Sequence, residues 1–164
     1  YALRMAASCA AHLQEEARGI ALLQRLCGEL ILAREWKNQV LASRGDLSAP
    51  EETKIRILVE EELAMEVEAR GLAASLHKRG QDFDLAEQEL SEILKLNPKL
   101  ARENFNRGMC RYWQGNLGGA AEDMRIFLSR TDLNFETEEV NTALDLIAEY
   151  EATQGAVNAI PSEG

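Results

Sequence analysis

Hydrophobic positions recur every three or four residues along most of this chain, which is the pattern of helices that bury one face. Residues 2–43 contain no proline and carry one such face, made up of Leu13, Ala17, Ile20, Leu23, Cys27 and Leu30. This pattern predicts one long helix or two helices stacked end to end. Glycine weakens a helix by about 1 kcal/mol relative to alanine, so we expect a break near Gly19 or Gly28. No window shows the alternation of period two that is typical of strands.

A second long helix is predicted between Ser48 and Gly80. Ser48 and Glu51 form a Ser-x-x-Glu capping box, and Pro50 lies in the first turn, where its missing N–H costs nothing. The apolar face is interrupted at Glu62 and otherwise consists of Ile55, Leu58, Met65, Ala69, Leu72 and Leu76. Because the first two helices are long and adjacent in sequence, we expect the N-terminal half of the second to pack on the first as an antiparallel hairpin.

Four shorter helices should follow. The first of them opens at Asp84 and Glu87 by the same capping logic and closes at Asn97-Pro98. The last has Val140, Leu144 and Ile147 on one side and acidic residues on the other, the polar outer face that the end of a helical array needs. Residues 155–164 are predicted to be a disordered tail. The remaining three predicted ranges are 99–114, 118–130 and 136–152.

Two segments of the chain repeat one pattern at a distance of about 34 residues. Gly80 recurs as Gly115, Phe83 as Leu117 and Ala86 as Ala120, and a period of this length marks helical repeat arrays. The pattern resembles the tetratricopeptide repeat (TPR). The unit of that family has a first helix with leucine, a small residue and a turning glycine, and a second helix with two alanine-like positions and a closing proline.

The resemblance covers about two repeats, over residues 67–132. The better copy consists of Leu72, Ala73, Leu76, Gly80, Phe83, Ala86, Ile93 and Pro98, with one extra residue between Gly80 and Phe83. The second copy consists of Gly108, Gly115, Leu117, Ala120 and Phe127, with Asp132 in place of the proline. Arg107 and Arg111 fall where the family usually has leucine and tyrosine. We place Gly108 at the close-packing position, although a register shifted by one residue would put Phe105 and Tyr112 on the aromatic positions.

The resemblance implies an all-α fold, a TPR-like helical array (α-α superhelix) with a long N-terminal helical hairpin and a C-terminal capping helix. We expect the hairpin to occupy residues 1–66, the repeats and capping helix residues 67–154, and the tail residues 155–164. TPR proteins bind other proteins and do no chemistry. The resemblance therefore implies a non-enzymatic interaction module, an adaptor or scaffold that receives a helical or extended segment of a partner protein in a concave groove.

In TPR arrays the first helix of each repeat lines that groove. Carried onto this sequence, the groove residues are Arg70, Ala74, His77 and Lys78 in the better copy and Arg102, Phe105, Asn106, Met109, Tyr112 and Trp113 in the other. Aromatic residues, methionine and arginine are the types that interface cores favour. The alternative is that the aromatic side chains and Met109 pack against neighbouring helices of the chain itself.

One subset of the family grips the C-terminal carboxylate of chaperones with lysine, asparagine and arginine side chains. Asn106 matches the middle element of that clamp, and Arg70 could replace its first lysine. Ala74 stands where the first asparagine is required, and the predicted helix 136–152 offers no basic pair. Chaperone-tail binding is therefore not predicted.

The net charge of −10 argues against nucleic acid, because phosphate binding needs a surface of lysine and arginine, and equally against an anionic membrane surface. It favours a cationic or apolar segment of a partner protein. The alternative is that the acidity serves only to keep the protein soluble.

The sequence contains few candidates for chemistry, and we predict no catalytic residue, metal or cofactor. Cys9 and His12 lie three residues apart, but no second pair of ligands follows at a useful spacing, so a structural role is favoured. Glu60, Glu61 and Glu62 point in different directions on a helix and cannot form a paired acid–base site.

The three cysteines are odd in number and form no C-x-x-C pair, which favours the cytoplasm or another reducing compartment. No apolar stretch approaches the roughly 20 residues that span a bilayer. The chain begins at Tyr1 instead of Met, which suggests an excised domain or a processed product whose targeting peptide cannot be judged.

Two other functions remain open. The apolar face of residues 13–41, with Trp36 and Val40, could pair with a second copy and give a homodimer or a self-assembling scaffold. The chain also resembles the small acidic TPR chaperones of type III secretion. Those proteins carry three tandem repeats, whereas two are recognisable here, so this alternative ranks lower.

Overall fold

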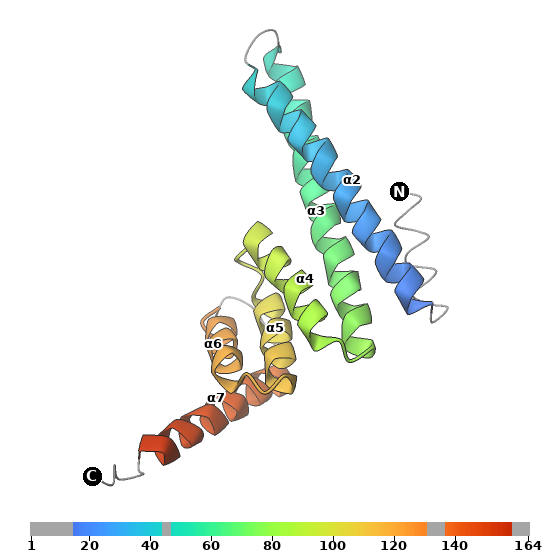
Figure 1. Ribbon diagram of the computed structural model, residues 1–164. Coiled ribbons are helices and arrows are strands. Elements are labelled where there is room, and N and C mark those ends of the chain that lie inside the picture. The colour runs from blue at the N-terminus through green and yellow to red at the C-terminus, as the bar shows by residue number, and fades with distance from the viewer. Residues whose placement is uncertain (1–14, 44–46, 131–136, 159–164) are drawn as a thin grey trace, which may run out of the picture. The chain divides into compact units, whose positions relative to one another are not determined.

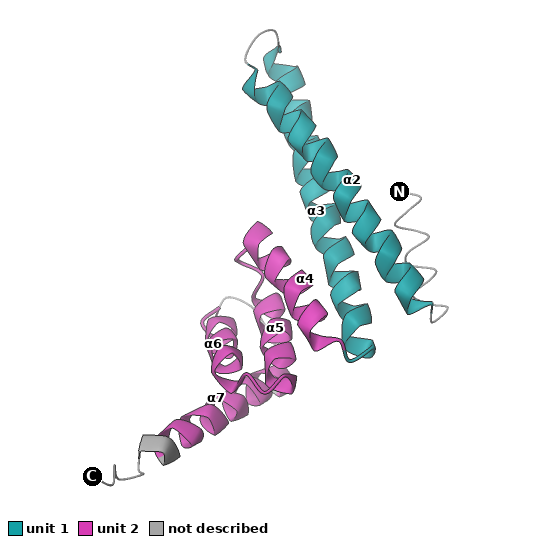
Figure 2. Cartoon of the chain, viewed as in Figure 1, with its two compact units in different colours: residues 1–81 teal, residues 82–164 magenta. Residues whose placement is uncertain are grey.

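The computed structural model describes residues 15–43, 47–130 and 137–158. Within these ranges all regular secondary structure is α-helical, as predicted. The chain forms two compact units that divide between Gln81 and Asp82, and each is described by itself (Figure 2). The predicted boundary between residues 66 and 67 falls inside a continuous helix. The helices are α2 (Glu16–Ala42), α3 (Ala49–Arg79), α4 (Phe83–Leu96), α5 (Ala101–Trp113), α6 (Leu117–Leu128) and α7 (Thr137–Asn158).

Helix α2 extends without interruption through both of its internal glycines, so the predicted break near Gly19 or Gly28 is absent. The reason is tertiary packing. Leu23, Leu26 and Leu30 are buried on both sides of Gly28, and each buried leucine contributes about 1.5–3 kcal/mol, which outweighs the weakness of one glycine. The predicted helical residues before position 15 lie outside the described part of the chain.

Helix α3 begins and ends where the sequence predicts. The backbone N–H of Ser48 donates to a carboxylate oxygen of Glu51 at 2.9 Å, which confirms the capping box. The helix packs against α2 as the predicted antiparallel hairpin (Figure 1). Near the C-terminal end of α3 the seam is apolar, and its buried residues are Leu23, Leu26, Cys27, Leu30, Ala69, Ala73 and Leu76.

Toward the connection between α2 and α3, the seam between the two helices becomes ionic. Glu66 is 1% exposed, and its carboxylate lies 2.7 Å from a guanidinium nitrogen of Arg34 and 2.9 Å from one of Arg70. Lys37 of α2 pairs in the same way with Glu62 of α3, and both side chains are largely buried. Glu62, which interrupts the apolar face of α3 in the sequence, is therefore a cross-helix ion-pair partner.

In the second unit each helix packs on the next: α4 on α5, α5 on α6, and α6 on α7. Sequential packing of this kind is typical of helical arrays. A core cluster of the second unit consists of Ala101, Ala120, Ala121, Met124, Phe127, Ala143 and Leu146. We call this cluster the second core.

Two predicted helix ends in this unit need correction. Helix α4 begins at Phe83 with Asp82 at the N-cap position, two residues earlier than the predicted Asp84. Helix α7 continues to Asn158, so the first four residues of the predicted disordered tail, 155–158, are helical. The last six residues, 159–164, lie outside the described part of the chain.

The turns before α4 and α6 each contain a residue in the left-handed region, Gln81 with φ of 63° and Gly115 with φ of 81°. These positions are 34 residues apart. The counterpart of Gly115 is therefore Gln81, and the predicted match with Gly80 is wrong by one residue. With this alignment no extra residue is needed before Phe83. Four pairs of buried residues share the spacing: Ala74 and Gly108, Ala86 and Ala120, Leu90 and Met124, and Ile93 and Phe127.

Gly108 is the point of closest approach between α5 and α6. A Cβ atom added there would lie 3.0 Å from the terminal methyl of Met124, 3.1 Å from Cβ of Asp123 and 3.3 Å from the carbonyl oxygen of Ala120, tighter than nine in ten real Cβ contacts. A side chain at this position would therefore force α6 to shift by a few tenths of an ångström. This tight contact agrees with the register in which Gly108 is the close-packing residue.

Candidate functional site

Four residues of α5 share one face of the helix and are open to solvent to different degrees. Arg102, Asn106, Met109 and Trp113 follow one another at spacings of four, three and four, which brings them into one line on a helix. Arg102 and Trp113 are exposed, and Asn106 and Met109 are half-buried. We call these four residues the α5 stripe. All four belong to the groove residues predicted from the sequence.

Trp113 ends the stripe and is held from one side only. Its indole packs on the ring of Phe83, with ring centroids 4.9 Å apart and planes tilted by 36°. Even so, 49% of Trp113 stays exposed. Tryptophan offers a large contact area and loses little rotamer freedom on binding when its ring is already held. The Phe83 contact therefore supports the Trp113 ring while about half of the residue stays open to solvent.

The two polar residues of the stripe are each paired with an acidic neighbour. A guanidinium nitrogen of Arg102 lies 3.3 Å from a carboxylate oxygen of Glu139 on α7. The amide of Asn106 donates to Glu103 at 3.1 Å, one turn earlier on α5. The stripe is therefore polar at its Arg102 end and apolar at its Trp113 end.

The other two aromatic groove residues face the interior of the chain. Phe105 and Tyr112 are half-buried and pack against the second core. The ring centroid of Phe105 lies 5.1 Å from that of Phe127. For these two residues the structure shows packing on neighbouring helices, the alternative that the sequence left open. Met109 also contacts the second core, from the edge of the stripe.

The groove residues predicted on α3 belong to the first unit. Ala74 is 1% exposed and His77 is 5% exposed, so both side chains are closed to solvent in this structure. Arg70 pairs with the buried Glu66, and its side chain is 15% exposed. Lys78 is half-buried in the last turn of α3. The contact of these α3 residues with a partner stays a prediction.

An ion-pair cluster that the sequence did not predict fixes α5 against its neighbours. Asp123 of α6 is fully buried and accepts hydrogen bonds from Arg107 at 2.6 and 3.0 Å and from Arg111 at 3.1 Å. Arg111 also donates to Glu87 of α4 at 2.7 Å. Arg107 and Arg111 are the positions where the TPR pattern has leucine and tyrosine. Charge pairing therefore replaces the expected apolar contacts between α4, α5 and α6.

The carboxylates around Arg111 keep its guanidinium charged. Burial acts to lower the pKa of Arg111, but the hydrogen bond to Glu87 and the charges of Asp123, Glu87 and Glu122 raise it on balance. A charged arginine donates stronger hydrogen bonds than a neutral group would. Arg111 therefore contributes a permanent positive charge to this structural brace.

The described residues hold no cluster of three or more histidine, cysteine, aspartate or glutamate side chains suited to a metal ion. Cys27 lies in the apolar seam between α2 and α3, and Cys110 is buried in α5. The candidate pair Cys9 and His12 lies outside the described residues. Among the described helices, none has the length and apolar character to cross a bilayer.

No family model matches the sequence, and no curated protein matches it. One solved structure that is similar is that of MamA (AMB-1). It is 15% identical, the alignment covers 98% of this chain and 93% of that chain, and the TM-score is 0.39. At this TM-score the likeness decides neither the fold nor the function of this chain.

Proposed function

We propose that this chain is a non-enzymatic protein-interaction module, built as a TPR-like helical array, that binds a helical or extended segment of a partner protein along the α5 stripe. The observation that carries the proposal is Trp113, a half-exposed tryptophan braced by Phe83 at the end of a line of arginine, asparagine and methionine. Tryptophan and arginine are the residue types that dominate binding energy in interfaces.

The helical array supports the same conclusion. Buried residues repeat at a period of 34, and Gly108 lets α5 and α6 approach closely. Rigid arrays of this type present extended binding surfaces, and the ion-pair cluster of Asp123 holds α5 in place. The partner segment that best complements a chain of net charge −10 is cationic or apolar.

The test is affinity capture with the intact chain as bait, read by mass spectrometry, beside two tryptophan variants. Trp36 on α2 is 63% exposed and provides a matched control for Trp113. We expect Trp113→Ala to lose proteins that the wild type retains, and Trp36→Ala to retain them. Equal capture by wild type and Trp113→Ala would remove the α5 stripe as the binding surface.

Self-assembly is a second candidate function, favoured by a specific observation on α2. Leu32 and Trp36 are 67% and 63% exposed and lie one helical turn apart. Exposed apolar side chains of this size mark association surfaces when they gather on one face. If they pair with a second copy, sedimentation should show dimers at high micromolar concentration that Trp36→Ala converts to monomers. A monomeric wild type at that concentration excludes this alternative.

A further inference from the structure

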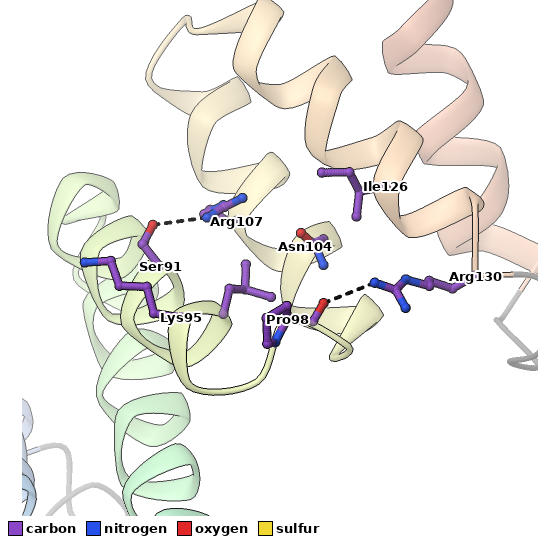
Figure 3. Close-up of a pocket in the computed structure, with 8 residues that line it drawn as sticks. Ser91, Lys95, Pro98, Asn104, Arg107, Ile126 and Arg130 are labelled. Atoms are coloured by element: carbon purple, nitrogen blue, oxygen red, sulfur yellow. Dashed lines mark hydrogen bonds between the residues drawn. The ribbon is translucent and has the colours of Figure 1, made fainter.

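A pocket of about 590 Å³ opens within the second unit, among residues of α4, α5 and α6 (Figure 3). It shares no residue with the α5 stripe, since its α5 residues are Asn104 and Arg107. Leu94, Pro98 and Ile126 give it an aliphatic lining. Its volume lies within the range of roughly 300–1,000 Å³ that is typical of ligand-binding pockets.

Basic side chains line the pocket. Among the described residues these are Lys95, Arg107 and Arg130, and none of the described lining residues is aspartate or glutamate. The whole chain has 28 acidic and only 18 basic residues, so a lining with basic and no acidic side chains departs from the rest of the chain. A cation in such a lining that lacks a carboxylate partner attracts anionic groups.

The three cations are not equally available. Arg107 is neutralised by the buried Asp123, to which two of its guanidinium nitrogens donate. The third guanidinium nitrogen of Arg107 donates to the Ser91 hydroxyl at 3.4 Å (Figure 3). Lys95 pairs with Glu92 at the surface. Arg130 donates to the carbonyl oxygen of Pro98 at 3.3 Å, and no carboxylate pairs with it among the described residues. Arg130 therefore provides the cation that an incoming carboxylate can engage.

We propose that this pocket binds an acidic segment of a partner protein, with an aliphatic side chain inserted against Leu94, Pro98 and Ile126 and a neighbouring carboxylate accepting hydrogen bonds from Arg130. A pocket that combines an aliphatic lining with a cation at its border selects a ligand that carries both features. Nucleic acid offers no aliphatic group for this lining, so the pocket favours a polypeptide segment. This site is independent of the α5 stripe and takes a segment of opposite charge.

The test uses a short synthetic peptide with blocked termini in which pairs of glutamates alternate with pairs of leucines. Binding to the intact chain is followed by fluorescence anisotropy and mapped by amide chemical shifts. We expect saturable binding that weakens as salt is raised, with shifts around Ser91, Pro98 and Ile126. Replacing glutamate by glutamine, or leucine by alanine, in the peptide should each weaken binding about tenfold.

Arg130→Glu should also weaken binding about tenfold, because it exchanges an attraction for a repulsion. The matched control is Arg125→Glu, the same charge change on α6 at an exposed arginine outside the pocket. Trp113→Ala should leave peptide binding unchanged, which separates this site from the proposed function.

Three outcomes would overturn the proposal. They are no peptide binding, equal binding by wild type and Arg130→Glu, and binding of octanoate as tight as that of the peptide. The last result would identify the pocket as a site for small aliphatic acids.

Discussion

Two arginines on α5 occupy positions where a TPR sequence has apolar residues, and a buried acid compensates for both. Asp123 is 0% exposed, and it receives hydrogen bonds from Arg107 and Arg111. In the sequence, Asp123 is one of many acids on helices with polar faces, and nothing in its spacing singles it out. Arg107 and Arg111 could be recognised as departures from the pattern, but the partner that explains them is known only from the α5–α6 contact.

Asp123→Ala should lower the free energy of unfolding by about 3 kcal/mol, because it leaves two largely buried guanidinium groups without their shared carboxylate. Urea denaturation measures the change. The control is Glu151→Ala, which removes an exposed pair with Arg125 and should cost less than about 1 kcal/mol. Equal losses in the two variants would show that the cluster does not brace α5.

Gln81 holds a backbone conformation that suits glycine. Its φ is 63°, whereas the equivalent position in the next turn is Gly115. Gln81→Gly should raise the free energy of unfolding by about 1 kcal/mol, because a residue with a Cβ is strained in the left-handed region. Gly115→Ala should lower it by a similar amount, and Gln81→Ala should leave it unchanged. A loss of stability in Gln81→Gly would contradict the assignment of the turn.

Helix ends were predicted correctly where a local signal determines them. Ser48 and Glu51 mark the start of α3 and Gly80 marks its end, and each signal lies within a few residues of the helix end that it determines. The structure confirms both ends. The break expected near Gly28 fails because leucines on both sides of that glycine are buried against α3, a tertiary contact that local pattern does not reveal. The start of α4 was misplaced because Asp82 and Asp84 are both suitable capping residues and the sequence does not choose between them.

The capping box at the start of α3 gives a dependence on pH. The hydrogen bonds from the hydroxyl and the backbone N–H of Ser48 lower the pKa of Glu51 below the ordinary value of 4.5. A lowered pKa means that the stabilisation is complete above that ordinary value and is lost as the pH falls through the folded value. The protection factors of the amides in the first turn of α3, which correct for the slower intrinsic exchange in acid, should therefore fall on acidification below about pH 4.5.

Glu51→Gln should remove most of this pH dependence, because glutamine does not ionise. Glu60→Gln in the same helix is the control, since Glu60 is exposed and lies outside the capping box. Exchange in the first turn that responds to pH equally in wild type and Glu51→Gln would show that the box does not cap α3.

At the scale of the whole chain, local pattern could not decide which groove residues stay open. Phe105 and Tyr112 lie on the same short helix as Trp113, yet they pack on a core to which α7 contributes Ala143 and Leu146. That contact joins segments more than thirty residues apart. The sequence predicted the helical class and the candidate helix, and the three-dimensional packing reduced the candidate surface on α5 to the stripe from Arg102 to Trp113.

Titration calorimetry with a captured partner tests most directly whether the α5 stripe is the binding surface. Combined replacement of Met109 and Trp113 by alanine should weaken binding at least tenfold, because buried tryptophan anchors dominate interface energy. Thermal unfolding of the variant should still be cooperative, and Trp36→Ala should bind as the wild type does. Wild-type affinity in the folded double variant would contradict the claim that the α5 stripe binds the partner.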